Sequence, residues 1–107
     1  MRNMDDDTLI IVTADWEKAS MYLKKVCDEV AKELNLALEE KKEDWEFLVN
    51  FGQRDDIGGV DLPQAFIKLS DGKVVHLMTR VPLTNDGQPD LKSAKELIKR
   101  KIAELRG

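Results

Sequence analysis

Hydrophobic and polar positions along the chain follow different periods, and each change of period predicts a new element. The run "TLIIVTA" (residues 8–14) is continuous, apolar and rich in β-branched residues, which is typical of a strand buried on both faces of a sheet. From residue 16 to residue 34 the period becomes helical and predicts one long helix. Its apolar stripe comprises Tyr22, Leu23, Val26, Cys27, Val30, Ala31 and Leu34. Thr13 or Asp15 is the expected N-cap.

The middle of the chain predicts shorter elements. Residues 36–41 alternate between apolar and polar and indicate a second strand. The segment "DWEFLVNFGQ" indicates a short helix that begins after Asp44 as N-cap and ends at Gly52. The aromatic residues of this helix are expected to pack inside the protein: Trp45, Phe47 and Phe51.

The second half of the chain opens with a hairpin. "QAFIKLSDGKVVHLMTRV" holds two strand-like runs joined by Asp-Gly, a strong signal for a tight turn between antiparallel strands. Strand alternation places His76 on the face opposite Val75 and Leu77, at the surface or half-buried. After the loop "PLTNDGQPD", Asp90 is the expected N-cap of a last helix. The buried stripe of that helix is predicted to comprise Leu91, Ala94, Leu97, Ile98, Ile102 and Leu105.

The order of these elements, β-α-β-α-β-β-α, predicts an α/β fold. A strand, a crossover helix and a second strand form a right-handed parallel unit, and the hairpin adds antiparallel strands. We therefore expect a four-stranded mixed sheet with helices on both faces. At 107 residues the chain has the length of one domain. We assign this domain to residues 8–107 and interpret residues 1–7 as a flexible acidic lead.

Charge and cysteine content narrow the possible functions. The net charge of −4 argues against a general nucleic-acid binder, although residues 91–107 are basic and leave contact with nucleic acid or an acidic protein as an alternative. A single cysteine, Cys27, excludes an intrachain disulfide and fits a reducing cytoplasm. No apolar run approaches the ~20 residues that cross a bilayer. Abundant Lys and Glu are compatible with a thermophilic source.

Several acidic pairs invite a metal or glycosidase interpretation. Adjacent residues on a strand or loop point apart, and no spaced partner completes a site, so we expect these pairs to be solvated. The pairs are Asp5–Asp7, Glu39–Glu40 and Asp55–Asp56. The sequence therefore predicts neither a metal site nor a cofactor.

A set of local features resembles the thioredoxin fold. The segment "WEKASMYLKKVCDEVAKEL" can be laid without a gap on the family's active-site tryptophan and the long helix that follows it. Leu62-Pro63 stands just before the hairpin, where the family has a hydrophobic residue and a cis-proline. With "SDGK" and the last helix in the same order, the similarity covers roughly residues 8–107; the family's usual extra N-terminal strand and helix are missing. The resemblance implies a thioredoxin-like sheet and a cis Leu62–Pro63 bond.

The sequence departs from this family where the family does its chemistry. Glu17 stands in place of the attacking cysteine, Ser20 in place of the resolving cysteine and Ile11 in place of the buried acid. Gln64 follows the proline where threonine is usual. Disulfide exchange needs a thiolate with a depressed pKa and a second thiol that releases the mixed disulfide. We therefore expect a redox-inactive protein with no catalytic residues.

The resemblance implies a binding surface instead of an active centre. In the family, backbone groups near the cis-proline pair with an extended peptide, which does not require cysteine. The expected partner is a protein or an extended peptide segment, not a membrane or a nucleic acid. The expected surface comprises Trp16, Glu17, Lys18, Ser20, Leu62, Pro63 and Gln64.

An enzymatic function is the main alternative. It would be a thiol-dependent oxidoreductase that uses Cys27, or a glutathione-binding enzyme that uses the helix start near Ser20. Cys27 lies on the apolar stripe of the first helix, which favours a small buried side chain over a reactive thiol.

Overall fold

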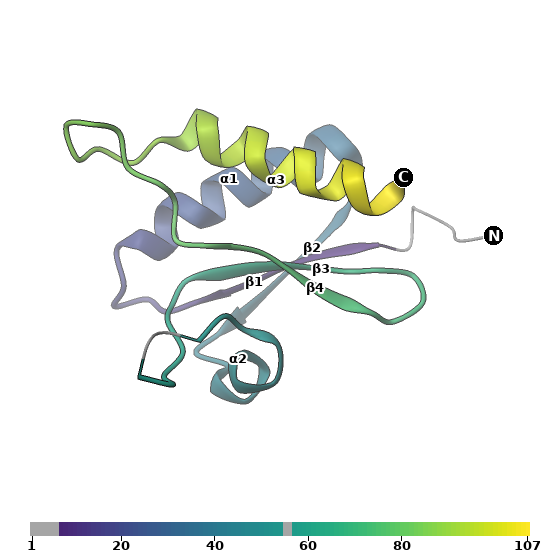
Figure 1. The fold of residues 1–107 in the computed structure, drawn as a ribbon, viewed down its shortest axis with the longest axis horizontal. Coiled ribbons are helices and arrows are strands. Elements are labelled where there is room, and N and C mark those ends of the chain that lie inside the picture. Colours follow the sequence, from purple (N-terminus) through teal and green to yellow (C-terminus); the bar gives the residue numbers. More distant parts are fainter. Residues whose placement is uncertain (1–6, 55–56) are drawn as a thin grey trace.

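The computed structural model describes residues 7–54 and 57–107, which form an α/β fold in the predicted order (Figure 1). The strands are β1 (Thr8–Thr13), β2 (Ala37–Lys42), β3 (Gln64–Lys68) and β4 (Val74–Thr79). The helices are α1 (Ala19–Leu34), α2 (Trp45–Phe51) and α3 (Leu91–Arg106). The sheet order is β2-β1-β3-β4, with β1 parallel to β2 and antiparallel to β3, and β3 antiparallel to β4. The prediction of a four-stranded mixed sheet is confirmed.

Strand β1 is central, and both of its faces are covered. Leu9 and Ile11 face a hydrophobic core shared with α1 and α3, whereas Ile10 and Val12 face a smaller core shared with α2. Figure 1 shows α1 and α3 together on one side of the sheet and α2 on the other. All four side chains are at most 2% exposed. Two covered faces explain why this strand is a continuous apolar run.

The starts of α2 and α3 follow the local sequence signals. The Asp44 carboxylate accepts a hydrogen bond from the Phe47 N–H at 3.0 Å, and the Asp90 carboxylate accepts one from the Ser93 N–H at 3.1 Å. Gly52 ends α2, and its N–H donates to the Leu48 carbonyl. These predicted caps are confirmed, because each depends only on residues within one helical turn.

The prediction that Thr13 or Asp15 caps α1 was wrong. Helix α1 begins at Ala19, and no side chain hydrogen-bonds as its cap from the N-cap position, Lys18. Thr13 is the last residue of β1, and its hydroxyl donates to the Glu40 carboxylate at 2.8 Å. Asp15 instead forms an ion pair with a lysine of β2. A turn separates β1 from α1, so both candidates lie too early in the chain to cap the helix.

The hairpin of β3 and β4 closes at the predicted Asp-Gly turn. The Leu69 N–H donates to the Lys73 carbonyl at 2.8 Å, and Gly72 adopts a φ of +91°, which favours glycine. His76 is half-buried; one of its ring nitrogens lies 2.8 Å from the Thr79 hydroxyl. Both the turn and the position of His76 agree with the predictions.

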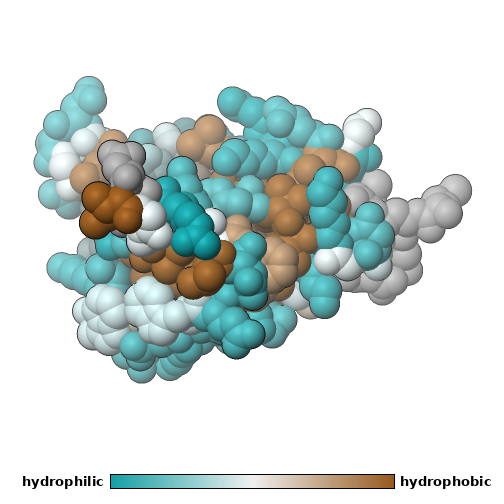
Figure 2. Space-filling model, turned by 60° about the horizontal axis from the view of Figure 1, so that its bottom comes forward, coloured by the Kyte–Doolittle hydropathy of each residue, from teal (hydrophilic) through white to brown (hydrophobic). Residues whose placement is uncertain are grey.

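Several apolar residues expected inside the protein lie on its surface. Trp45 is 43% exposed and Phe51 is 45% exposed, whereas Phe47 packs partly against the smaller core. Helix α2 is short, and only Leu48 in it is fully buried, so Trp45 and Phe51 remain largely on the surface. Leu97 of α3 is 39% exposed and also departs from the prediction. Figure 2, which brings the α2 side forward, shows hydrophobic side chains scattered among hydrophilic ones on this face.

The prediction that Asp7 belongs to a flexible acidic lead was wrong. Asp7 is fully buried, accepts a hydrogen bond from the Ser70 N–H at 2.9 Å and lies 3.6 Å from the Arg106 Nε. Residues 1–6 lie outside the described part, as do Asp55 and Asp56 of the predicted acidic pairs.

The described residues contain neither a group of three or more His, Cys, Asp or Glu placed to hold a metal ion nor a helix with the length and apolar character that a membrane span requires. Of the predicted acidic pairs, Glu39–Glu40 is described in full. Both of its residues form ion pairs, Glu39 with Lys41 and Glu40 with Lys24.

Candidate functional site

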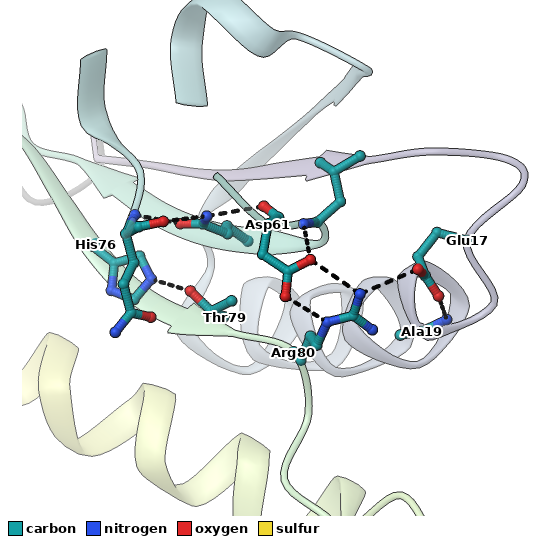
Figure 3. A network of polar contacts seen from close by, with 9 residues as sticks. Glu17, Ala19, Asp61, His76, Thr79 and Arg80 are labelled. Carbon is teal, nitrogen blue, oxygen red and sulfur yellow. Dashed lines mark hydrogen bonds and ion pairs between the residues drawn. The ribbon is translucent and has the colours of Figure 1, made fainter. Parts of the chain in front are cut away.

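Three segments distant in the sequence meet at the end of β1 where α1 begins. They are residues 14–20, the loop 61–63 before β3 and the residues that follow β4, and they are joined by the polar network of Figure 3. The Leu62–Pro63 peptide bond in the second segment is cis, as the resemblance implies. The structure therefore brings the two predicted halves of the site together.

Arg80 links these segments. It follows β4, and its backbone adopts a φ of +58°, which is uncommon for a residue with a side chain. Its Nε donates to Asp61 Oδ2 at 2.8 Å, and its Nη2 donates to Asp61 Oδ1 at 3.0 Å and to Glu17 Oε2 at 3.2 Å (Figure 3). This bidentate contact, in which two N–H groups of Arg80 donate to the two oxygens of Asp61, is the strongest arrangement of a guanidinium and a carboxylate.

The charges of this network stabilise one another. The hydrogen bond from Arg80 is the main cause that lowers the pKa of Asp61. The pKa of Glu17 is lowered first by the hydrogen bond from the Ala19 N–H and then by the one from Arg80. The two carboxylates in turn raise the pKa of the Arg80 guanidinium. All three groups are partly exposed, so solvent screens both ion pairs and each contributes little to stability.

Glu17 occupies the place at the start of α1 where a thiolate would be stabilised. Its Oε1 accepts a hydrogen bond from the Ala19 N–H at 3.2 Å, so a carboxylate of the chain itself already uses this end of the helix. Ser20 is 5% exposed, and its hydroxyl oxygen accepts a hydrogen bond from the Ala14 N–H at 3.1 Å. A buried hydroxyl held as an acceptor is poorly placed to act as a nucleophile or to contact glutathione.

Cys27 is completely buried. Burial in the core is the main cause that raises the pKa of its thiol to about 12. The reactive form of cysteine is the thiolate, which is scarce at neutral pH when the pKa is this high. The geometry therefore favours the interpretation of Cys27 as a small core side chain.

The predicted surface residues divide into exposed and buried groups. Trp16 is 63% exposed, and its indole N–H donates to the Glu43 carboxylate at 3.0 Å. Lys18 is exposed and Glu17 is half-buried. The side chains of the remaining predicted residues lie inside the protein: Ser20, Leu62, Pro63 and Gln64.

The side chain of Gln64 holds the loop before β3 in place. Its Oε1 accepts a hydrogen bond from the Gln53 N–H at 2.8 Å. Its Nε2 donates to the Gln53 carbonyl at 3.1 Å and to the Asp61 carbonyl at 2.9 Å. This buried amide holds both ends of the loop before β3 and so positions Asp61 for Arg80.

The backbone groups expected to receive a peptide are used within the chain. The Leu62 N–H donates to Asp61 Oδ1 at 2.8 Å, and the Pro63 carbonyl accepts a hydrogen bond from the Arg80 N–H at 3.1 Å. A strand-like partner could reach the Leu62 N–H only by displacing the Asp61 side chain. Asp61 and Arg80 are central to this arrangement, and sequence reasoning missed both.

Sequence reasoning also missed a hollow of about 440 Å³ between the first turn of α1 and the loop after β4. Apolar side chains make up much of its wall, and Leu83, one of them, is 64% exposed. Met21, in the first turn of α1, is 68% exposed. An exposed apolar residue in a loop or on the polar side of a helix has no periodic signal, so only its position in the fold reveals it.

The basic residues of α3 are largely engaged within the protein. Lys95 and Lys99 both form ion pairs with Glu33 of α1. The Lys101 ammonium donates to the Leu77 carbonyl at 2.6 Å. The carboxylate of Glu33 offsets part of the positive charge that α3 offers to a nucleic acid.

No protein-family model matches the chain, and a search of the curated proteins finds no match.

Proposed function

We propose that the chain is a redox-inactive thioredoxin-fold protein that acts as a protein- or peptide-binding module. The order of elements, the sheet order β2-β1-β3-β4 and the cis bond before β3 support the likeness to thioredoxins. Glu17, a buried Ser20 and a buried Cys27 support the absence of thiol chemistry. The cellular role of this module depends on the partner that it binds.

The observation that carries the proposal is that three large apolar side chains around the start of α1 are exposed to solvent. Trp16, Met21 and Leu83 are 63%, 68% and 64% exposed. Exposed apolar side chains that form a contiguous patch mark sites of interaction, and we propose that these three contribute to one such site. The contact surface that we propose combines these residues with Lys18, Glu17 and Arg80, and the buried residues Leu62, Pro63 and Gln64 support it from below.

An affinity capture from a lysate of the source organism tests this proposal. The wild type is compared with a Trp16→Ser/Met21→Ser variant and with a control, Val49→Ser/Ile57→Ser, which removes apolar side chains that are 50% and 92% exposed elsewhere. We expect one protein to be retained in stoichiometric amount by the wild type and the control and lost by the Trp16/Met21 variant. Retention by the Trp16/Met21 variant, or the absence of any stoichiometric partner, would contradict the proposal.

A further inference from the structure

The hollow beside the first turn of α1 combines apolar walls with positively charged groups. Its wall is formed by Lys18, Ala19, Tyr22, Arg80, Val81, Leu83, Gly87, Gln88 and Pro89. Two of these residues are cationic, and none is acidic. The protein as a whole carries a net charge of −4, whereas the wall of this hollow contains cations and no carboxylate.

The cations of the hollow retain donor capacity. Arg80 uses Nε and Nη2 for Asp61 and Glu17, whereas no hydrogen bond within the described residues reaches its Nη1; Figure 3 shows no dashed line to this nitrogen. Lys18 is exposed, and in the described part of the chain its ammonium forms no ion pair. A ligand that supplies acceptors here would meet donors that are already positioned.

We propose that this hollow binds a peptide segment in which an apolar side chain stands next to a carboxylate. The apolar side chain would pack on Tyr22, Val81 and Leu83, and the carboxylate would accept hydrogen bonds from Lys18 and from Nη1 of Arg80. This inference rests on the proposed function and specifies the partner of the same surface.

Size and charge both favour this occupant. A volume of about 440 Å³ lies within the range of small-ligand sites, roughly 300–1,000 Å³, and suits a few side chains of an extended segment. The two carboxylates Asp61 and Glu17 together offset the charge of Arg80, so Lys18 supplies the attraction for an anion and Arg80 supplies a directed donor, Nη1. Removal of the Glu17 charge should therefore strengthen the binding of an acidic peptide.

Three capped hexapeptides serve as probes in an NMR titration of the 15N-labelled protein. They are acetyl-Gly-Leu-Glu-Leu-Glu-Gly-amide and the versions with Gln or Lys in place of Glu. We expect the acidic peptide to shift the amide signals of residues 18–22 and 81–89 with a Kd of about 1 mM or tighter. The Gln peptide should bind about fivefold more weakly, because it lacks the ion pairs.

Two variants with the same change of charge locate the effect. Lys18→Glu should weaken the binding of the acidic peptide about tenfold, since it removes one attraction and adds one repulsion. A carboxylate at the start of a helix does not disturb folding. Lys73→Glu, in the hairpin turn at the far end of β4, should leave the affinity unchanged at 0.15 M salt. Glu17→Gln should tighten the binding.

Three results would overturn this inference: no shifts with the acidic peptide, equal affinity for all three peptides, or an equal effect of Lys18→Glu and Lys73→Glu. N-acetyl-leucine is a further arm, and if it bound as tightly as the hexapeptide the ligand would be a small carboxylic acid and not a peptide. Trp16 and Met21, which are changed in the capture experiment, do not line the hollow. If the Trp16/Met21 variant lost a captured partner while the peptides did not bind in the titration, the result would therefore contradict only this inference and not the proposed function.

Discussion

Helices α1 and α2 both follow a strand closely, yet their starts are built differently. Helix α2 begins directly after its N-cap Asp44, whose carboxylate accepts a hydrogen bond from a backbone N–H three positions away. Helix α1 begins at Ala19, whose N–H donates to the Glu17 carboxylate, and this carboxylate is held from the other side by Arg80, 63 positions away from Glu17 in the sequence. A start that is capped locally needs nothing from the rest of the fold. A start held by distant residues brings three segments together, and it is there that we place the binding surface.

Loss of the Gln64 amide should have the largest effect on the long-range arrangement. Gln64→Ala removes three part-buried hydrogen bonds and leaves the backbone groups of Gln53 and Asp61 without the side chain that holds them. We expect the free energy of unfolding to fall by about 3 kcal/mol. Chemical denaturation measures this loss, and a change below about 1 kcal/mol would show that water replaces the amide without strain.

Substitutions of Arg80 separate its ion pairs from its backbone conformation. Arg80→Ala should lower the free energy of unfolding by about 1 kcal/mol, because it removes contacts with two partly exposed carboxylates. Arg80→Gly removes the same contacts. Glycine, however, adopts the φ of +58° without the steric cost of roughly 1 kcal/mol that a residue with a Cβ atom has in this conformation. The glycine variant should therefore unfold near the wild type. Equal losses in both variants would contradict this account of the backbone.

The local cap of α2 provides the contrasting case. Asp44→Ala should cost about 1 kcal/mol, since the Phe47 N–H loses its acceptor. Hydrogen exchange should accelerate in α2 but not in the first turn of α1. Faster exchange at both helix starts would mean that they are coupled, and the contrast between them would then fail.

Low pH should destabilise the arrangement around the start of α1, because it protonates the carboxylates of Glu17 and Asp61. We expect this effect to be the smallest of the four. The pKa values of Glu17 and Asp61 are lowered in the folded state from ordinary values of 4.5 and 3.8. Their stabilisation is therefore present above these ordinary values and is lost as the pH falls through the lower folded-state values. An Arg80→Gln variant should lose less stability on acidification than the wild type. Parallel losses in thermal denaturation from pH 6 to pH 2 would contradict this role of Arg80.

Local signals explain which parts of the fold could be predicted from the sequence. The run of residues 9–12, the Asp-Gly turn and the N-cap Asp90 depend on near neighbours, and the structure agrees with each prediction. The cis Leu62–Pro63 bond was predicted from the resemblance alone. By contrast, neither the contact of Asp61 with Arg80 nor the hollow beside α1 has a periodic signature, because distant segments create both.

The candidate site was predicted in outline and not in detail. The resemblance pointed to one end of the sheet, where the structure brings the two predicted segments together and exposes Trp16 and Lys18. It did not distinguish residues that would face a partner from residues such as Gln64 that hold the loop from inside. Burial depends on how the loops fold over the sheet end, and no pattern in the loop sequences encodes this.

A photo-crosslinking measurement tests the central claim most directly. The photoreactive amino acid p-benzoylphenylalanine is placed at position 16 in one protein and, as a control on the exposed face of α2, at position 49 in another. Both proteins are irradiated in a lysate of the source organism. We predict that one protein is crosslinked from position 16 and not from position 49. Crosslinks of equal yield from both positions, or none from position 16, would contradict the claim that the start of α1 is a binding surface.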